Sequence, residues 1–101
     1  MTNDTEKPID VNDPFARRLI LQYLGRRRDE TSILRSALAN GHFDKIRITG
    51  HNLSGSGSAY GLARVSELGA GLESAAKGRN SAEIARLIEE LDRYVSSLRL
   101  T

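Results

Sequence analysis

Apolar residues recur at intervals of three and four positions through most of this chain, which is the spacing of amphipathic helices. The first such stretch begins at Asp13-Pro14, because aspartate is a favoured N-cap and proline suits the first helical position. It runs to Asn40-Gly41, a pair typical of helix C-termini. We therefore predict one helix between these two signals. The residues on its inward face are Ala16, Leu19, Ile20, Tyr23, Thr31, Leu34, Ala37 and Leu38.

Two charged residues, Arg27 and Glu30, fall on the same face of this helix as the apolar ones. Either they form a partly buried ion pair three residues apart, or the helix bends or breaks near Gly25. We favour one long helix.

Three further helices are predicted by the same periodicity. The second covers 43–60 and stops at Gly61. The third covers about 62–77 and closes with Lys77-Gly78, a cation followed by a glycine. Its inward residues are Val65, Leu68, Gly69, Leu72 and Ala75. The last helix follows Asn80, which with Glu83 three residues on is typical of a capping box. Its apolar face is Ile84, Leu87, Ile88, Leu91, Val95 and Leu98.

No stretch of useful length alternates apolar and polar residues, so no strand is expected. Four helices joined by short loops predict an all-α fold, an antiparallel up-down four-helix bundle. The bundle should occupy residues 13–101 as one domain. Residues 1–12 are polar without periodicity, which predicts a flexible N-terminal tail.

The second helix presents a histidine on its outer side. With Leu53 at zero on a helical wheel, the apolar Ile46 and Tyr60 lie within about 20° of it, whereas His51 lies about 160° away. The imidazole is therefore predicted to face solvent. Its neighbours on that side are Asp44, Arg47, Ile48, Ser54, Gly55 and Ser58.

The glycines of this helix fall into two groups. Gly50 and Gly57 lie beside the apolar stripe, where they allow close packing of another helix. Gly55 lies on the side of His51, although an internal helical glycine costs about 1 kcal/mol relative to alanine. An isolated surface histidine commonly has no role. The small residues one turn after His51, Ser54 and Gly55, favour a functional role for this histidine. Gly55 would let a partner approach the ring.

Composition excludes several kinds of site. The 101 residues contain no cysteine, so neither disulfides nor thiolate metal sites are possible. With two histidines and no carboxylate cluster at ligand spacing, we expect no metal site. No apolar run approaches the roughly 20 residues of a membrane span, and no signal-peptide pattern is present at the N-terminus. We expect a cytoplasmic monomer without membrane partners.

Fifteen basic residues leave a net charge of only +2, but they are unevenly placed. The run Arg26-Arg27-Arg28 could belong to a nucleic-acid patch. No aromatic residue is interleaved with it, and Asp29 and Glu30 follow at once. We therefore interpret the run as a solvated helix face or a docking surface for an acidic protein, and expect no nucleic-acid partner.

The residues around His51 resemble the signature of the histidine-containing phosphotransfer (HPt) domain. The match consists of His51, Leu53, Gly55 and Gly61, with Leu72-Glu73 in the following helix. It extends over residues 13–101, because the number and lengths of the helices also fit. One position departs from the family: the usual lysine three residues after the histidine is Ser54.

The resemblance implies that His51 accepts a phosphoryl group from an aspartate on one receiver domain and passes it to another. The implied partners are the receiver domains of a hybrid sensor kinase and of a response regulator, and Mg²⁺ is expected in the receiver. When the roles of the family's residues are transferred to the matching positions, Gly55 is the small residue that permits docking. Ser54 stands where the family has the cation that would counter the phosphate charge. Arg47, one turn before His51, is a candidate to supply that charge. The remaining docking candidates are Ile48 and Ser58.

Neutral imidazole is a competent nucleophile for phosphoryl transfer. The chain has no glycine-rich nucleotide loop and no carboxylate cluster for Mg²⁺, so we expect a phosphoryl carrier without a cofactor of its own rather than an ATP-using enzyme. An alternative stays open, in which the bundle acts only as a protein-interaction adaptor without phosphotransfer.

Overall fold

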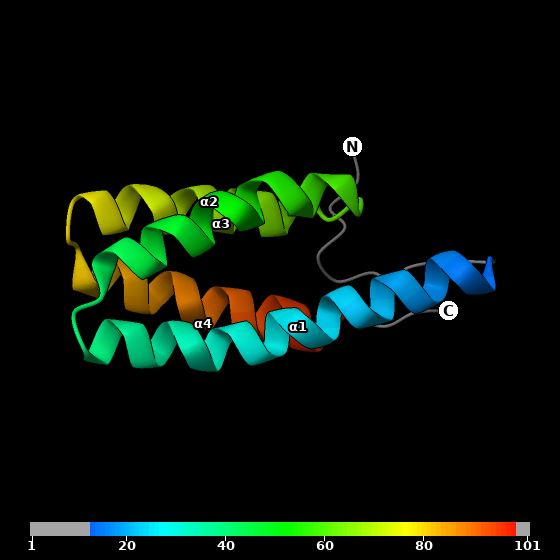
Figure 1. Cartoon of the computed structure of the whole chain (residues 1–101), viewed down its shortest axis with the longest axis horizontal. Coiled ribbons are helices and arrows are strands. Elements are labelled where there is room, and N and C mark those ends of the chain that lie inside the picture. The colour runs from blue at the N-terminus through cyan, green and yellow to red at the C-terminus, as the bar shows by residue number, and fades with distance from the viewer. Residues whose placement is uncertain (1–12, 99–101) are drawn as a thin grey trace.

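The computed structural model describes residues 13–98, which form four helices and no strand (Figure 1). The helices are α1 (Pro14–Ala39), α2 (Phe43–Ala59), α3 (Ala63–Lys77) and α4 (Ser81–Ser97). The prediction of an all-helical four-helix bundle is confirmed, and the helix ends agree to within about one residue. The predicted tail at 1–12 lies outside the described residues.

Each helix packs against two neighbours, so α2 contacts α1 and α3 but not α4. The most extensive contact joins α2 and α3, which run side by side as one layer over α1 and α4 (Figure 1). One side of α2 is consequently left uncovered by the bundle. The buried apolar core draws on all four helices, with Tyr23, Leu34, Ile46, Leu53, Leu68, Leu72, Ile84, Ile88 and Leu91 among its members.

The ends of α1 follow the sequence signals, but its burial differs from the prediction. The Asp13 side chain accepts a hydrogen bond from the Phe15 amide at 3.1 Å, and Gly41 adopts a φ of 70° after the helix end. The first turns of α1 extend past the ends of the other helices (Figure 1). Leu19, predicted to face inward, is therefore 38% exposed, while Leu24, outside the predicted face, is buried.

Arg27 and Glu30 form the partly buried pair that was one of the two alternatives. The Arg27 Nε atom lies 2.8 Å from Glu30 Oε1, and α1 continues through Gly25 without a break. The Arg27 guanidinium also stacks over the Tyr23 ring, 4.3 Å from its centroid. Burial raises the pKa of the Glu30 carboxyl above its ordinary value, against the opposing effect of Arg27. Ionising Glu30 as the pH rises therefore lowers the stability of the fold.

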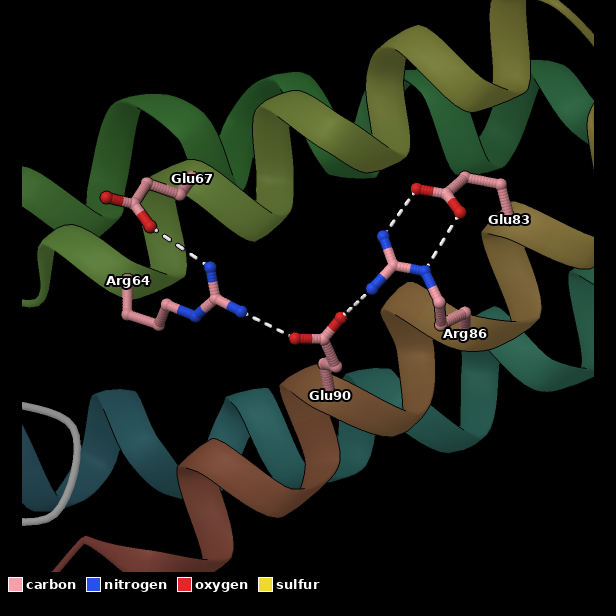
Figure 2. A network of polar contacts seen from close by, with 5 residues as sticks. All are labelled: Arg64, Glu67, Glu83, Arg86 and Glu90. Atoms are coloured by element: carbon pink, nitrogen blue, oxygen red, sulfur yellow. Dashed lines mark hydrogen bonds and ion pairs between the residues drawn. The ribbon is translucent and has the colours of Figure 1, made fainter.

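A chain of ion pairs connects α3 to α4. Figure 2 shows the Arg64 guanidinium between Glu67 of its own helix, at 3.1 Å, and Glu90 of α4, at 2.5 Å. The other oxygen of Glu90 accepts a hydrogen bond from Arg86, which also binds Glu83 through two nitrogens. Hydrogen bonds from Arg86 hold the pKa of the Glu83 carboxyl below its ordinary value. Exposed pairs of this kind add little stability, but they favour one register of α4 on α3.

A second cluster of ion pairs fixes the opposite side of α4. Arg35 of α1 donates to Glu89 at 3.0 Å and to Asp92 at 2.9 Å, and both hydrogen bonds raise the pKa of Arg35. These ion pairs join α4 to both α1 and α3, and none of them involves a residue of α2.

The helix ends around α3 and α4 show two departures from the sequence signals. Gly61 has a φ of 74°, as expected for the residue that stops α2. Gly78, in contrast, has a φ of −86°, and the left-handed residue is Arg79 with a φ of 51°. At the start of α4, the Asn80 side chain accepts from the Glu83 amide at 3.1 Å. The Glu83 carboxylate turns to Arg86 instead of completing the capping box.

Candidate functional site

Three glycines bring the backbones of α2 and α3 into contact, and we call them the glycine seam: Gly50, Gly57 and Gly69. A Cβ atom on Gly50 would lie 2.6 Å from the Glu73 amide nitrogen and 2.7 Å from the Gly69 carbonyl oxygen. A Cβ on Gly57 would lie 2.6 Å from the Ser66 amide nitrogen. These distances are shorter than any side chain tolerates, so glycine is required at each position. The inward placement predicted for Gly50 and Gly57 is confirmed.

His51 follows directly after Gly50 and projects from the uncovered side of α2. Its side chain is 71% exposed, which confirms the prediction that it faces solvent. The Nδ1 atom lies 3.3 Å from Oε2 of Glu73 on α3. Because a carboxylate can only accept a hydrogen bond, this contact favours the neutral tautomer that carries its proton on Nδ1. Nε2 is then the nitrogen with a free lone pair.

Glu73 is the residue at this site whose part the sequence analysis did not assign. It was noted only as a member of the Leu72-Glu73 motif. The glycine seam places α3 against α2 so closely that Glu73 meets the ring from the neighbouring helix. The same Oε2 atom also lies 3.7 Å from Nζ of Lys77, one turn further along α3. Glu73 therefore connects the imidazole to a cation that the helical wheel of α2 could not reveal.

The surroundings of Gly55 are open. A Cβ atom built there would have no neighbour within 4 Å, so this glycine is not needed for packing. Ile48 is 50% exposed on α2, as expected for a residue on the free side of the helix. Both residues are placed where a docking partner would reach them.

Three other predicted site residues have contacts within the chain. Ser54 is half-buried, and its amide nitrogen faces Gly69 across the seam. The Arg47 Nε atom lies 3.9 Å from Asp44, one turn before it. The Ser58 hydroxyl pairs with the Ser66 hydroxyl at 3.0 Å. Their predicted parts in phosphate binding and docking remain predictions.

An aromatic pair fixes the end of α2 to α1. Tyr60 stacks on Tyr23 with 4.1 Å between the ring centroids, and the Tyr23 hydroxyl hydrogen-bonds with that of Ser56 at 2.8 Å. Tyr60 is only partly buried but packs against the core, in the position that the apolar stripe indicates. Together with the glycine seam, these contacts hold the helix that carries His51 on both sides.

The site has the chemical character of an exposed nucleophile whose ring contacts a carboxylate on the neighbouring helix. Within residues 13–98, no group of three or more His, Asp or Glu side chains is arranged to hold a metal ion. In the same part of the chain, no helix has both the length and the apolar character of a membrane span.

Of the comparisons with known proteins, one covers nearly all of the described bundle. A family model for the Hpt domain matches residues 18–101. Comparison with curated proteins and with solved structures found no match in either set.

Proposed function

Because the chain belongs to the Hpt domain family, whose members carry phosphoryl groups in phosphorelay signalling, we propose that His51 is the residue that carries the group here. Hpt domains exchange this group with receiver domains and are phosphoryl carriers rather than ATP-using enzymes. For this chain we propose the receiver domain of a hybrid sensor kinase as donor and that of a response regulator as acceptor. The protein would act as a cytoplasmic monomer.

One observation carries the assignment to His51. Its ring is exposed on the uncovered side of α2, and its Nδ1 atom is in contact with Glu73. The other histidine, His42, lies at the N-cap of α2 and makes no side-chain capping hydrogen bond. His51 is thus the histidine with both access for a partner and an oriented reactive nitrogen.

The proposed reaction follows from this tautomer. The Nε2 lone pair attacks the phosphorus of an aspartyl phosphate, so an N–P bond forms while the P–O bond to the aspartate breaks and its carboxylate leaves. The proton on Nδ1 stays in place, and the ring becomes positively charged. Glu73 faces that charge at 3.3 Å and stabilises it. Transfer to the second receiver reverses the same steps, and each receiver supplies its own Mg²⁺.

We further infer that the helices alternate in direction, as an up-down bundle does. Two sets of contacts support this order. Tyr23, early in α1, lies against Tyr60 at the end of α2. Gly57, late in α2, lies against Ser66 near the start of α3, whereas Gly50 lies against Glu73 further along. Such a bundle keeps α2 between α1 and α3 and leaves its fourth side free for docking.

The direct test is transfer from a panel of purified receiver domains, each phosphorylated with a small-molecule phosphodonor such as acetyl phosphate. We expect at least one receiver to label the chain, with a bond that is stable in base and labile in acid, as a phosphoramidate is. If the chain binds a receiver but takes no label from any member of the panel, it is an adaptor and the carrier function is wrong.

A cation should stabilise the phosphorylated ring, since phosphorylation adds about −1.5 to −2 charges. Lys77 is the first candidate, because Glu73 holds its ammonium near the imidazole. Arg47 is the second, although Asp44 competes for it. We expect Lys77→Gln to shorten the lifetime of the phosphorylated protein about threefold to fivefold at low salt, and Arg47→Gln to have a smaller effect. The measurement is loss of label over time.

The control for these variants restores the family's usual residue. Adding Ser54→Lys to Lys77→Gln should return the lifetime to the wild-type value, and high salt should reduce all the differences by screening. Equal lifetimes of the wild type and both single variants at low salt would show that the site works without a cation of its own.

Gly55 should matter for docking rather than for the fold. We expect Gly55→Leu to slow transfer from the receiver at least tenfold while the helical circular-dichroism signal is retained, because the new side chain would stand in open space beside His51. The matched control is Ala85→Leu on the exposed side of α4, which adds similar bulk away from α2. Transfer by Gly55→Leu at the wild-type rate would contradict the steric role.

A further inference from the structure

A cleft of about 500 Å³ lies where the α1–α2 loop meets the end of α3, and we call it the basic cleft. Its lining includes Phe43, Asp44, Lys45, Lys77 and Arg79. Three of these side chains are cations and one is a carboxylate. Asp44 offsets part of this charge, and Glu73 lies 3.7 Å from the Lys77 ammonium. The cleft still carries a net positive charge.

Arg79 occupies its place in this cleft against a backbone preference. Its φ of 51° is in the left-handed region, and no other non-glycine residue among 13–98 has a positive φ. Glycine would adopt this conformation without strain, yet the glycine of this loop is one residue earlier, at Gly78, where φ is −86°. The sequence thus keeps an arginine where the backbone favours glycine.

Packing alone does not account for that arginine. Its guanidinium lies 5.3 Å from the centroid of the Phe43 ring, and this cation–π contact joins the α3–α4 loop to the first residue of α2. At an exposed site such a contact is no stronger than the strain of a left-handed arginine. The contact does, however, hold the guanidinium over the cleft. The left-handed conformation itself belongs to the end of α3, because the Arg79 amide donates to the Ala76 carbonyl at 3.1 Å and the Asn80 amide donates to the Ala75 carbonyl at 2.9 Å. This cap does not explain why the residue is an arginine and not a glycine, and its cation over the cleft points to a role in binding.

The basic cleft is continuous with the environment of His51. Lys77 lines the cleft and also contacts the Glu73 oxygen that lies against the imidazole. Along α2, Asp44 precedes His51 by seven residues, a rise of about 10 Å. An ordinary protein interface covers about 800 Å² on each partner, a patch of roughly 16 Å radius. A domain seated on His51 therefore also covers the cleft.

We propose that the basic cleft is a second contact area for the receiver domain and binds acidic side chains on the receiver's docking face, outside the pocket that holds its phosphorylated aspartate. The proposal rests on the phosphotransfer function above. Charge complementarity selects an acidic surface as the occupant, and continuity of the cleft with the surroundings of His51 places that surface on the docked receiver. Contacts at the rim of an interface act chiefly on the encounter rate. The cleft accordingly governs partner choice and association, while His51 and Glu73 carry out the transfer.

Arg79→Gly tests the proposal, because it removes the cation and relieves the backbone strain together. The probe is the phosphorylated receiver domain that labels the wild-type chain fastest in the panel. At about 50 mM salt we expect the second-order rate constant of transfer to fall about threefold, and about tenfold when Lys45→Gln is added. The rate at saturating receiver should not change. The thermal midpoint should stay equal or rise, and Arg79→Lys should keep most of the wild-type rate.

The control is Arg93→Gln, which removes an exposed cation of α4, and it should transfer as the wild type does. Two results would overturn the proposal: a wild-type rate constant for Arg79→Gly at low salt, or a marked fall in its thermal midpoint, which would show that the arginine serves the fold. Both are separate from failure of the carrier function itself, in which no receiver labels even the wild-type chain.

Discussion

His51→Gln abolishes acceptance of the phosphoryl group from every receiver in the panel and leaves the fold intact: this is the largest effect we expect. The side chain is 71% exposed, and its one described contact is with Glu73, so its loss removes the reacting nitrogen without opening the core. The measurement is labelling of the variant beside the wild type, together with circular dichroism and the thermal midpoint.

The matched control is His42→Gln at the N-cap of α2, which should accept the group at the wild-type rate because that side chain makes no capping hydrogen bond. Full labelling of His51→Gln, or a label that survives acid, would assign the phosphoryl group to another residue.

Gly50→Ala should destabilise the fold, because the added methyl group has no room in the glycine seam. Its Cβ atom would lie 2.6 Å and 2.7 Å from two backbone atoms of α3, which cannot move aside as a side chain can. Overpacking of this kind costs about 3 kcal/mol, which exceeds the gain of about 1 kcal/mol in helix propensity. We therefore expect the free energy of unfolding to fall by about 2 kcal/mol, measured by urea denaturation.

Gly55→Ala is the control in the same helix, and it should change stability in the opposite direction. A Cβ atom at Gly55 has no neighbour within 4 Å, so the helix gains up to about 1 kcal/mol from the better residue. If the two alanine variants have the same stability, the close approach of α2 to α3 at Gly50 is wrong.

Those features that depend on one helix at a time could be predicted from the sequence. The wheel of α2 separated the inward glycines Gly50 and Gly57 from the outward Gly55, because the face of each residue depends only on its spacing. The N-cap at Asp13 and the stop at Gly61 followed from local hydrogen bonding and backbone freedom in the same way.

What the sequence left open depends on how the helices meet. Leu19 has the right spacing to face inward, but periodicity does not tell where the neighbouring helices end, and α1 continues beyond them. The contact of Glu73 with His51 and the position of Lys77 depend on the register of α3 against α2. The wheel of α2 alone could propose only Arg47 as a cation. The sequence did hold one indication of this register. Gly50 and Gly69 are inward-facing helical glycines that could lie opposite each other across α2 and α3.

The glycine seam also has a consequence for the entropy of the proposed transfer. The helix that bears His51 is held backbone to backbone against α3, and Glu73 faces the ring from that second helix. The conformational freedom of this backbone is therefore lost once, when the chain folds, and not again at every encounter. A receiver that docks as we propose meets a histidine whose backbone is already in place. The two proposed partners can then differ in what they must order, while this chain presents the same helix surface to both.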